Sequence, residues 1–316
     1  MGNHAEFFFS GHSCLAALAL LSTAMPAHSE PSSEPEALSS IQSIAPEFIA
    51  ESSEVEGDAR GFTSANPYVS AEYPENGNGT ADVTTDFGTG STSYGITLPE
   101  ARGVEKAERQ DSIVSYGTKS GFSTVATAGD DGTVSVGTII ESKSAPSEYT
   151  YGVSSNGEPA VMTQLDDGSV DVFTADGELL THFRPAWAVD ADGRDAPTFY
   201  TINGGEITQT VEHEGYSYPI VADPKSGLYI KKVSLKSDPR GIIIQVYPGS
   251  YPANLPGNAL FADYKKLVGS NFHGRKYRDQ LVCHQNNAMH FKKPWNLDSW
   301  RPDVGYAKTV AKLCNP

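Results

Sequence analysis

The sequence predicts a mostly β protein, in which an antiparallel β leader domain (a meander) is followed by a small α+β domain closed by a disulfide. The chain has 30 Gly and 20 Pro among 316 residues, a composition that favours turns and short strands over long helices. From residue 112 to residue 224, apolar and polar residues alternate between Gly, Asn and Asp, which is typical of half-buried strands joined by tight turns.

The first element expected along the chain is a secretory signal peptide at residues 1–29. An apolar run from Cys14 to Ala24 has the length of a signal's hydrophobic segment, and Ala27 and Ser29 place small residues before a cleavage site. No Lys or Arg precedes the run, which departs from the usual signal. We therefore expect the protein to be secreted, with display at the cell surface as the alternative.

Residues 30–111 are predicted to be a disordered, acidic, low-complexity segment. The first half is rich in Ser, Glu, Pro and Ala with few aromatic residues, and the second half, from about Tyr68, is polar and rich in Gly, with short candidate strands at most. Such a composition offers too little apolar surface to compensate the entropy of folding.

Residues 112–224 are predicted to form the antiparallel β domain. Asp176-Gly177 and Asn203-Gly204 are strong hairpin signals, because both central residues of a type I′ turn need positive φ. The expected strands are Thr133–Ile140, Ala160–Leu165, Ser169–Thr174, Glu178–Phe183, Thr198–Ile202 and Glu206–Val211.

Residues 225–316 are predicted to form the α+β domain. Asp223-Pro224 marks the boundary, because a residue before proline is held extended. Two strands, two helices, a short element and an aromatic-rich loop between two cysteines are expected. They lie, in chain order, at Leu228–Leu235 and Gly241–Tyr247 (strands), Gly257–Val268 (helix), Gln280–His284 (short element), Phe291–Pro302 (loop) and Asp303–Leu313 (helix).

A disulfide between Cys283 and Cys314 is the simplest fate of the thiols that remain once the signal, with Cys14, is removed. Two cysteines in an oxidising compartment normally pair, and closing a loop of about 32 residues restricts the unfolded chain by roughly 3 to 4 kcal/mol. The alternative is a pair of buried free thiols that pack as small apolar groups.

The charge of the chain is divided unequally between its two parts. Residues 1–224 hold 8 Lys or Arg against 34 Asp or Glu, whereas residues 225–316 hold 15 against 5 and contain no Glu. Opposite signs indicate an intramolecular contact between the acidic leader and the basic tail, or a separate polyanionic partner such as a cell-envelope polymer or a target bacterial surface. Two independently solvated surfaces are the plain alternative.

Two stretches of the sequence resemble known protein families. Pro185–Pro224 resembles a leader-like β region of exported actinobacterial proteins. The tail resembles an uncharacterised C-terminal domain family of secreted Gram-positive proteins, through Gln280–His284, Pro294–Asp298, Trp300–Pro302 and Cys314–Pro316. The resemblance implies export, a cysteine pair and an exchangeable C-terminal domain, and it implies no established activity.

Histidines and arginines of the tail are weak candidates for catalysis. His284, His290 and Arg301, together with His273 and Arg275, would supply an acid, a base and phosphate-binding cations to a ribonuclease-like site. No known nuclease spacing matches, so a structural role is favoured. Because zinc needs three or four ligands and the tail lacks HExxH and CxxC spacings, we expect no metal and no cofactor.

Trp295, Asn296, Trp300 and Arg301 are the candidate ligand-binding residues. An aromatic side chain beside a guanidinium suits stacking on sugars or bases. The alternative is that both tryptophans form the core of the small domain and that Asn296 is a capping or turn residue.

Three functions follow from these observations. The first hypothesis is a secreted precursor whose cationic C-terminal domain acts on other bacteria, like a bacteriocin or toxin, with an immunity protein as partner. The second is a non-enzymatic module that binds the cell wall or a surface polyanion, and the third is a secreted nuclease. No GxSxG, P-loop, dinucleotide or DNA-recognition motif is present, so a non-enzymatic function is favoured.

Overall fold

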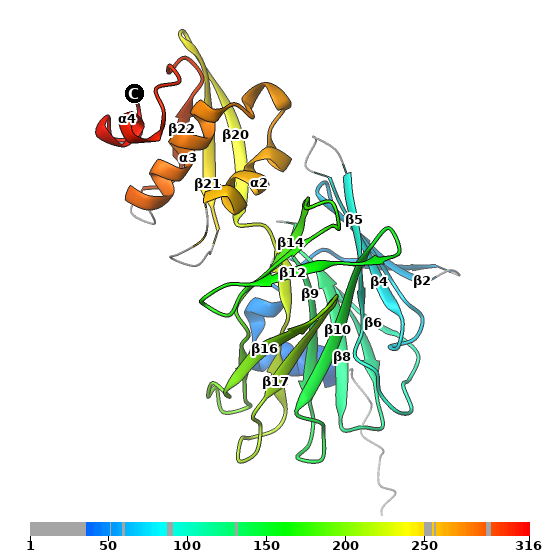
Figure 1. Cartoon of the computed structure of the whole chain (residues 1–316). Coiled ribbons are helices and arrows are strands. Elements are labelled where there is room, and N and C mark those ends of the chain that lie inside the picture. The colour runs from blue at the N-terminus through cyan, green and yellow to red at the C-terminus, as the bar shows by residue number, and fades with distance from the viewer. Residues whose placement is uncertain are drawn as a thin grey trace, which may run out of the picture. The chain divides into compact units, whose positions relative to one another are not determined.

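The computed structural model describes residues 36–50, 52–58, 61–86, 91–129, 132–249, 255, 257–288 and 292–316. These residues form antiparallel β sheets followed by a small α+β region with a disulfide, which confirms the predicted fold class (Figure 1). The expected signal peptide lies outside them. No helix among them is long and apolar enough to cross a membrane.

The β domain, residues 55–227, consists of two antiparallel sheets. The first has the strand order β1-β2-β3-β4-β5-β10-β17-β16, with β11 paired to β10, and the second has the order β12-β13-β14-β19-β9-β8-β7-β6, with β18 paired to β9 and β15 to β18. The first sheet contains β1 (Val55–Asp58), β2 (Gly61–Ala65), β3 (Val69–Tyr73), β4 (Thr80–Asp86), β5 (Ser91–Thr97), β10 (Glu148–Ser155), β11 (Glu158–Pro159), β16 (Thr198–Asn203) and β17 (Glu206–Val211). The second contains β6 (Glu108–Gln110), β7 (Ile113–Gly117), β8 (Phe122–Ala128), β9 (Val134–Ile140), β12 (Val161–Gln164), β13 (Val170–Phe173), β14 (Leu179–Phe183), β15 (Ala188–Val189), β18 (Ile220–Ala222) and β19 (Lys225–Gly227).

The core of the β domain lies between these two sheets and draws alternate residues from each. In β10, Tyr149, Tyr151 and Val153 are buried. At one pair of sheet edges the Gln164 amide donates to the Tyr200 carbonyl over 3.1 Å. The apolar-and-polar alternation of the sequence therefore corresponds to strands that bury one face.

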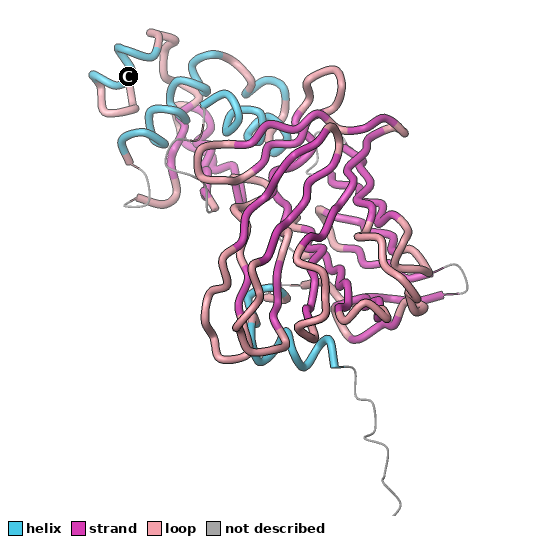
Figure 2. Tube along the Cα trace, turned by 60° about the horizontal axis from the view of Figure 1, so that its bottom comes forward, coloured by secondary structure: helices cyan, strands magenta, loops and turns pink. Residues whose placement is uncertain are grey.

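The strands β8 and β9 are buried along their whole length because both of their faces are covered. One face meets the opposing sheet, and the other meets the helix α1 (Glu36–Ile44) and the short helix η1 (Pro46–Phe48) through Ile41, Phe48, Val125 and Ile139. Figure 2 shows α1 beside the strands of the β domain. The sequences of β8 and β9 nevertheless mix apolar residues with small polar ones, and the polar residues are buried as well. These are Ser123, Thr124 and Thr127 of β8 and Ser135 and Thr138 of β9.

The expectation of disorder for residues 30–111 is wrong for the part that the structure describes. That part contains α1, the strands β1–β5 and the short strand β6. In β3, Val69, Ala71 and Tyr73 point inward while the residues between them are exposed. Apolar residues at every second position form a one-sided strand here, although the average composition of the segment is polar.

Both predicted hairpins exist, but their turns differ in detail from the prediction. Asn203 pairs with Glu206, so Gly204 and Gly205 are the two loop residues and Asn203 is the last residue of β16. In the other turn only Gly177 has positive φ, at 84°. The Asp-Gly and Asn-Gly dipeptides thus located each turn but did not determine which residues form its loop.

The boundary between the domains lies a few residues after the predicted Asp223-Pro224. The strand β19 (Lys225–Gly227) pairs with β9 and β14, in the middle of the second sheet. Asp223 is fully buried and accepts hydrogen bonds from the Trp187 N–H and the Gln209 amide. Residues 225–227, predicted to open the basic domain, therefore belong to the β domain.

The C-terminal domain, residues 228–316, is a three-stranded antiparallel sheet with helices on one face (Figure 1). Its first residues contact the β domain, because the hydroxyl of the buried Tyr229 donates to Asp171 of β13. The Tyr229 backbone N–H donates to Asp263, within the C-terminal domain itself. Its elements are β20 (Ile230–Asp238), β21 (Gly241–Pro248), α2 (Gly257–Leu267), η2 (Ser270–Phe272), α3 (Arg275–Asn287), β22 (Trp295–Asp298) and α4 (Tyr306–Ala311).

Two elements of this domain differ from the prediction. The short element expected at Gln280–His284 is the middle of the 13-residue helix α3. Part of the expected aromatic-rich loop is the strand β22, which pairs with β21. The helix shows no apolar stripe, because several of its buried side chains are polar and bond to neighbouring elements, as Gln280 does to the backbone of Asp298.

Candidate binding face of the C-terminal domain

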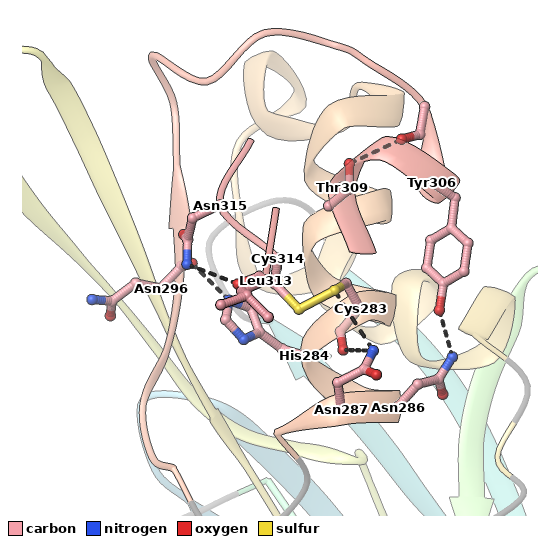
Figure 3. The surroundings of a disulfide bond; sticks show 11 residues. Cys283, His284, Asn286, Asn287, Asn296, Tyr306, Thr309, Leu313, Cys314 and Asn315 are labelled. Carbon is pink, nitrogen blue, oxygen red and sulfur yellow. Dashed lines mark hydrogen bonds between the residues drawn. A yellow bond between two sulfur atoms is a disulfide. The ribbon is translucent and has the colours of Figure 1, made fainter. Parts of the chain in front are cut away.

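The predicted disulfide between Cys283 and Cys314 is present and joins α3 to the segment that follows α4 (Figure 3). Both cysteines are buried. Next to the bridge, the Asn286 amide donates to the Tyr306 hydroxyl over 2.8 Å. The bridge and this contact hold α4 against α3.

His284 is a buried structural residue in this arrangement. Its Nε2 lies 3.1 Å from the Asn296 carbonyl oxygen, which can only accept a hydrogen bond, so this nitrogen carries the proton. Its ring is parallel to the Trp295 ring, with centroids 6.3 Å apart. Burial lowers the pKa of His284 to about 4. The imidazole is therefore neutral near pH 7, and its N–H donor is used by the hydrogen bond to the Asn296 carbonyl.

The other described members of the ribonuclease-like set also make structural contacts. The Nε2 of His273 bonds to the Val268 carbonyl over 3.0 Å. The Arg275 guanidinium is paired with Asp303 at 3.0 Å. His290 lies outside the described residues. The structure does not assemble a nuclease site from the described members of this set.

Arg301 holds two parts of the domain together. Its Nε donates to an Asp298 carboxylate oxygen over 3.0 Å, and a terminal nitrogen donates to the Pro316 carbonyl over 3.2 Å. These contacts join β22 to the segment after the disulfide. The guanidinium of Arg301 therefore has a structural role, and any part that it plays in catalysis or ligand binding must be compatible with these contacts.

The two tryptophans of the candidate binding set have different environments. Trp295 has no exposed surface and lies in the core beneath α3. Trp300 is half-buried, and the Arg240 guanidinium lies 4.3 Å from the centre of its ring. Asp238 fixes that guanidinium with two hydrogen bonds, of 2.8 and 3.2 Å. Only Trp300 offers an aromatic surface to a ligand.

The face of the sheet opposite the helices forms what we call the outer sheet face. The strand register places its side chains in adjacent rows, because residues at every second position share one face. All of them keep solvent exposure. They are Lys232, Ser234 and Lys236 of β20, Ile243, Gln245 and Tyr247 of β21, and Asn296 of β22. The same register places two carboxylates on this face, Asp238, which is paired with Arg240, and the buried Asp298, which is paired with Arg301.

A row of polar side chains crosses the middle of the outer sheet face. Ser234 donates to Gln245 over 3.5 Å, and Gln245 donates to the Asn296 side-chain oxygen over 3.4 Å. At one end of the face, the Lys232 ammonium lies 5.9 Å from the Tyr247 ring centre. The face thus combines amides, a hydroxyl, cations and an aromatic ring, the groups that suit a polar, anionic polymer.

Sequence reasoning found Asn296 and Trp300 but missed the residues of β20 and β21 that lie beside them. The missed signal was the alternation of Lys232, Ser234 and Lys236 with Val233 and Leu235, which marks two faces of one strand. The pairing of β21 with β22, which comes from the other end of the domain, had no local signal.

Comparison with known proteins finds a family model that matches part of the C-terminal domain. Residues 258–316 match the family model described as protein of unknown function (DUF2599). The match is consistent with the uncharacterised C-terminal domain family that the sequence resembles. No curated protein and no solved structure matches the chain significantly. The DUF2599 segment includes both cysteines and β22, whereas β20 and β21 precede it.

Proposed function

We propose that the C-terminal domain binds an anionic polymer of a bacterial cell surface through its outer sheet face. The protein is secreted, or displayed at the cell surface, to reach that polymer. The observation that carries the proposal is the outer sheet face itself, on which Lys232 and Lys236 flank a row of hydroxyl and amide groups beside an aromatic ring.

The charge of the domain supports an anionic partner. The 14 Lys or Arg of residues 228–316 exceed the 5 Asp or Glu by 9, and all five of those carboxylates lie near cations or in the interior: Asp238, Asp263, Asp279, Asp298 and Asp303. On the outer sheet face itself, Asp238 and Asp298 are paired with Arg240 and Arg301, which offsets much of their negative charge, and Asp238 also attracts the nearby Lys236. Such a surface attracts polyanions over about one Debye length.

The described histidines of the C-terminal domain support binding without catalysis. His284 is buried and neutral, and His273 bonds to a backbone carbonyl. A nuclease needs a histidine or carboxylate within reach of its substrate. The secreted nuclease therefore receives less support than a binding module.

The position of β19 supports a protein in which the β domain and the C-terminal domain stay joined. A cut near Pro224 would leave Lys225–Gly227 paired between β9 and β14. Release of a bacteriocin-like or toxin-like domain would then require this strand to leave the sheet. The effector hypothesis predicts killing of related bacteria and protection by an immunity protein, whereas a binding module leaves their growth unchanged.

The test is sedimentation of the full chain with purified Gram-positive cell walls at increasing salt. We expect the double variant Lys232→Gln/Lys236→Gln to bind about 30-fold more weakly than the parent, from about 1 kcal/mol for each lysine near an anionic surface. Added salt should weaken binding of the parent protein because it screens these charges.

The matched control is Lys308→Gln/Lys312→Gln, which removes two exposed charges on or just after α4. This control should keep nearly full binding. If both double variants lose binding equally, net charge and not the outer sheet face is responsible. If neither loses binding, the proposal fails.

A further inference from the structure

A cation lies beside an aromatic ring near each end of β20. At the start of the strand, Lys232 lies by Tyr247, its cross-strand neighbour. Beyond the end of the strand, Arg240 lies over Trp300. The two pairs come from different parts of the sequence, and only the folding of β22 and the segment after it brings Trp300 next to Arg240.

The distance between these pairs follows from the strand itself. Lys232 and Asp238 are six residues apart in β20, which corresponds to about 20 Å at roughly 3.3 Å per residue. Arg240 follows directly in the turn to β21. Lys236 and the polar row of Ser234, Gln245 and Asn296 lie between the two pairs.

Arg240 remains able to bind a ligand although it is paired with Asp238. Its side chain is 62 % exposed, and two of its five N–H donors are used by the carboxylate. The pair orients the guanidinium over the Trp300 ring. An anionic group of a ligand would meet a pre-positioned cation and an adjacent aromatic edge.

We infer that the partner is a linear polyanion that lies along β20 and contacts both cation–aromatic pairs at once. Its length must be at least about 20 Å. The inference rests on the proposed function and specifies the shape of its ligand. A single small anion, or a chain too short to reach from Lys232 to Arg240, would contact one pair only.

The experiment measures binding of the full chain to oligoglutamates of three, six, nine and twelve residues by calorimetry. An extended chain spans at most about 3.3 to 3.6 Å per residue, so three residues reach about 10 Å and nine reach about 30 Å. Contact with the second pair is then intramolecular, and we expect at least ~10-fold tighter binding per carboxylate between three and nine residues. Between nine and twelve residues we expect less than ~3-fold further gain.

Variants at either end should remove this step. Arg240→Gln and Lys232→Gln should each reduce binding of the nine-residue chain about 10-fold and change binding of the three-residue chain less than ~3-fold. The control Lys308→Gln/Lys312→Gln should keep the step. Trp300→Ala tests the aromatic part of the far pair in the same way.

Several results would overturn the inference. A smooth rise of affinity with ligand charge in every variant would mean that the polymer is held by diffuse attraction. Cell-wall binding that depends on Lys232 and Lys236 but shows no length step would remove this inference and leave the proposed function. Loss of the dependence on these lysines in the cell-wall assay would refute the proposed function itself.

Discussion

Removing the Cys283–Cys314 disulfide should destabilise the C-terminal domain by about 3.7 kcal/mol. The two cysteines are 31 residues apart, and the chain-entropy model relates a closed loop of about 32 residues to that free energy at 25 °C. Domains of this kind have total stabilities of about 5 to 15 kcal/mol. The bridge therefore supplies a large fraction of the stability.

Amide hydrogen exchange on the full chain measures this effect, with the oxidised protein compared to the variant Cys283→Ala/Cys314→Ala. Amides that exchange only by unfolding of the domain, such as those of Ile244 and Val246 in β21, should exchange several hundredfold faster in the variant. Amides of Ile139 in the β domain serve as the internal control and should keep their rates.

Two results would refute this reasoning. If the β21 amides change by less than ~3-fold, the bridge does not restrict the unfolded chain as the entropy model states. If only the amides of α4 (Tyr306–Ala311) exchange faster, the disulfide fixes that helix locally and the rest of the domain is stable without it.

Three further predictions concern single residues. Trp295→Ala should lower the free energy of unfolding by about 3 to 5 kcal/mol because it empties a fully buried core site. Trp300→Ala should lower the free energy of unfolding by less than ~1 kcal/mol. Urea unfolding of the two variants measures the difference. Burial lowers the pKa of His284 from 6.5 to about 4, so the unfolded state binds a proton at this residue at higher pH than the folded state does. The free energy of unfolding should therefore fall by about 3 kcal/mol as the pH decreases from 6.5 to 4. A His284→Gln variant should show a weaker dependence of stability on pH over this range. Burial raises the pKa of Asp223 from 3.8 to about 7, so its contribution to stability decreases as the pH rises between these values. Asp223→Asn should therefore stabilise the β domain at pH 8 by about 2 to 4 kcal/mol, measured by thermal unfolding. An unchanged or lower stability of the variant would contradict this prediction.

The fold class and the secondary structure of several segments could be predicted from local patterns. Alternation marked β17, in which every second residue is buried, and helical spacing of Leu260, Phe261, Tyr264 and Leu267 marked α2. These patterns are reliable because each element buries one face, and the period of its apolar residues reports its geometry.

The elements that were missed lack such a period. The helix α3 buries Asp279, Gln280 and Gln285 among its apolar residues, so no apolar stripe identifies it. The strand β22 has only four residues, and its inward Trp295 and Leu297 were equally consistent with a loop. Their structures depend on partners elsewhere in the chain.

The sequence by itself determined the β-rich class, the charge division and the cysteine pair, because composition, alternation and cysteine spacing are local properties of the chain. Only the tertiary structure decided which side chains form the candidate site. It placed Trp295 in the core and Trp300 beneath Arg240, and it aligned Asn296 with Gln245 and Ser234. Pairing between distant strands decides these positions, since a strand's register fixes which of its residues share a face and which neighbours they meet.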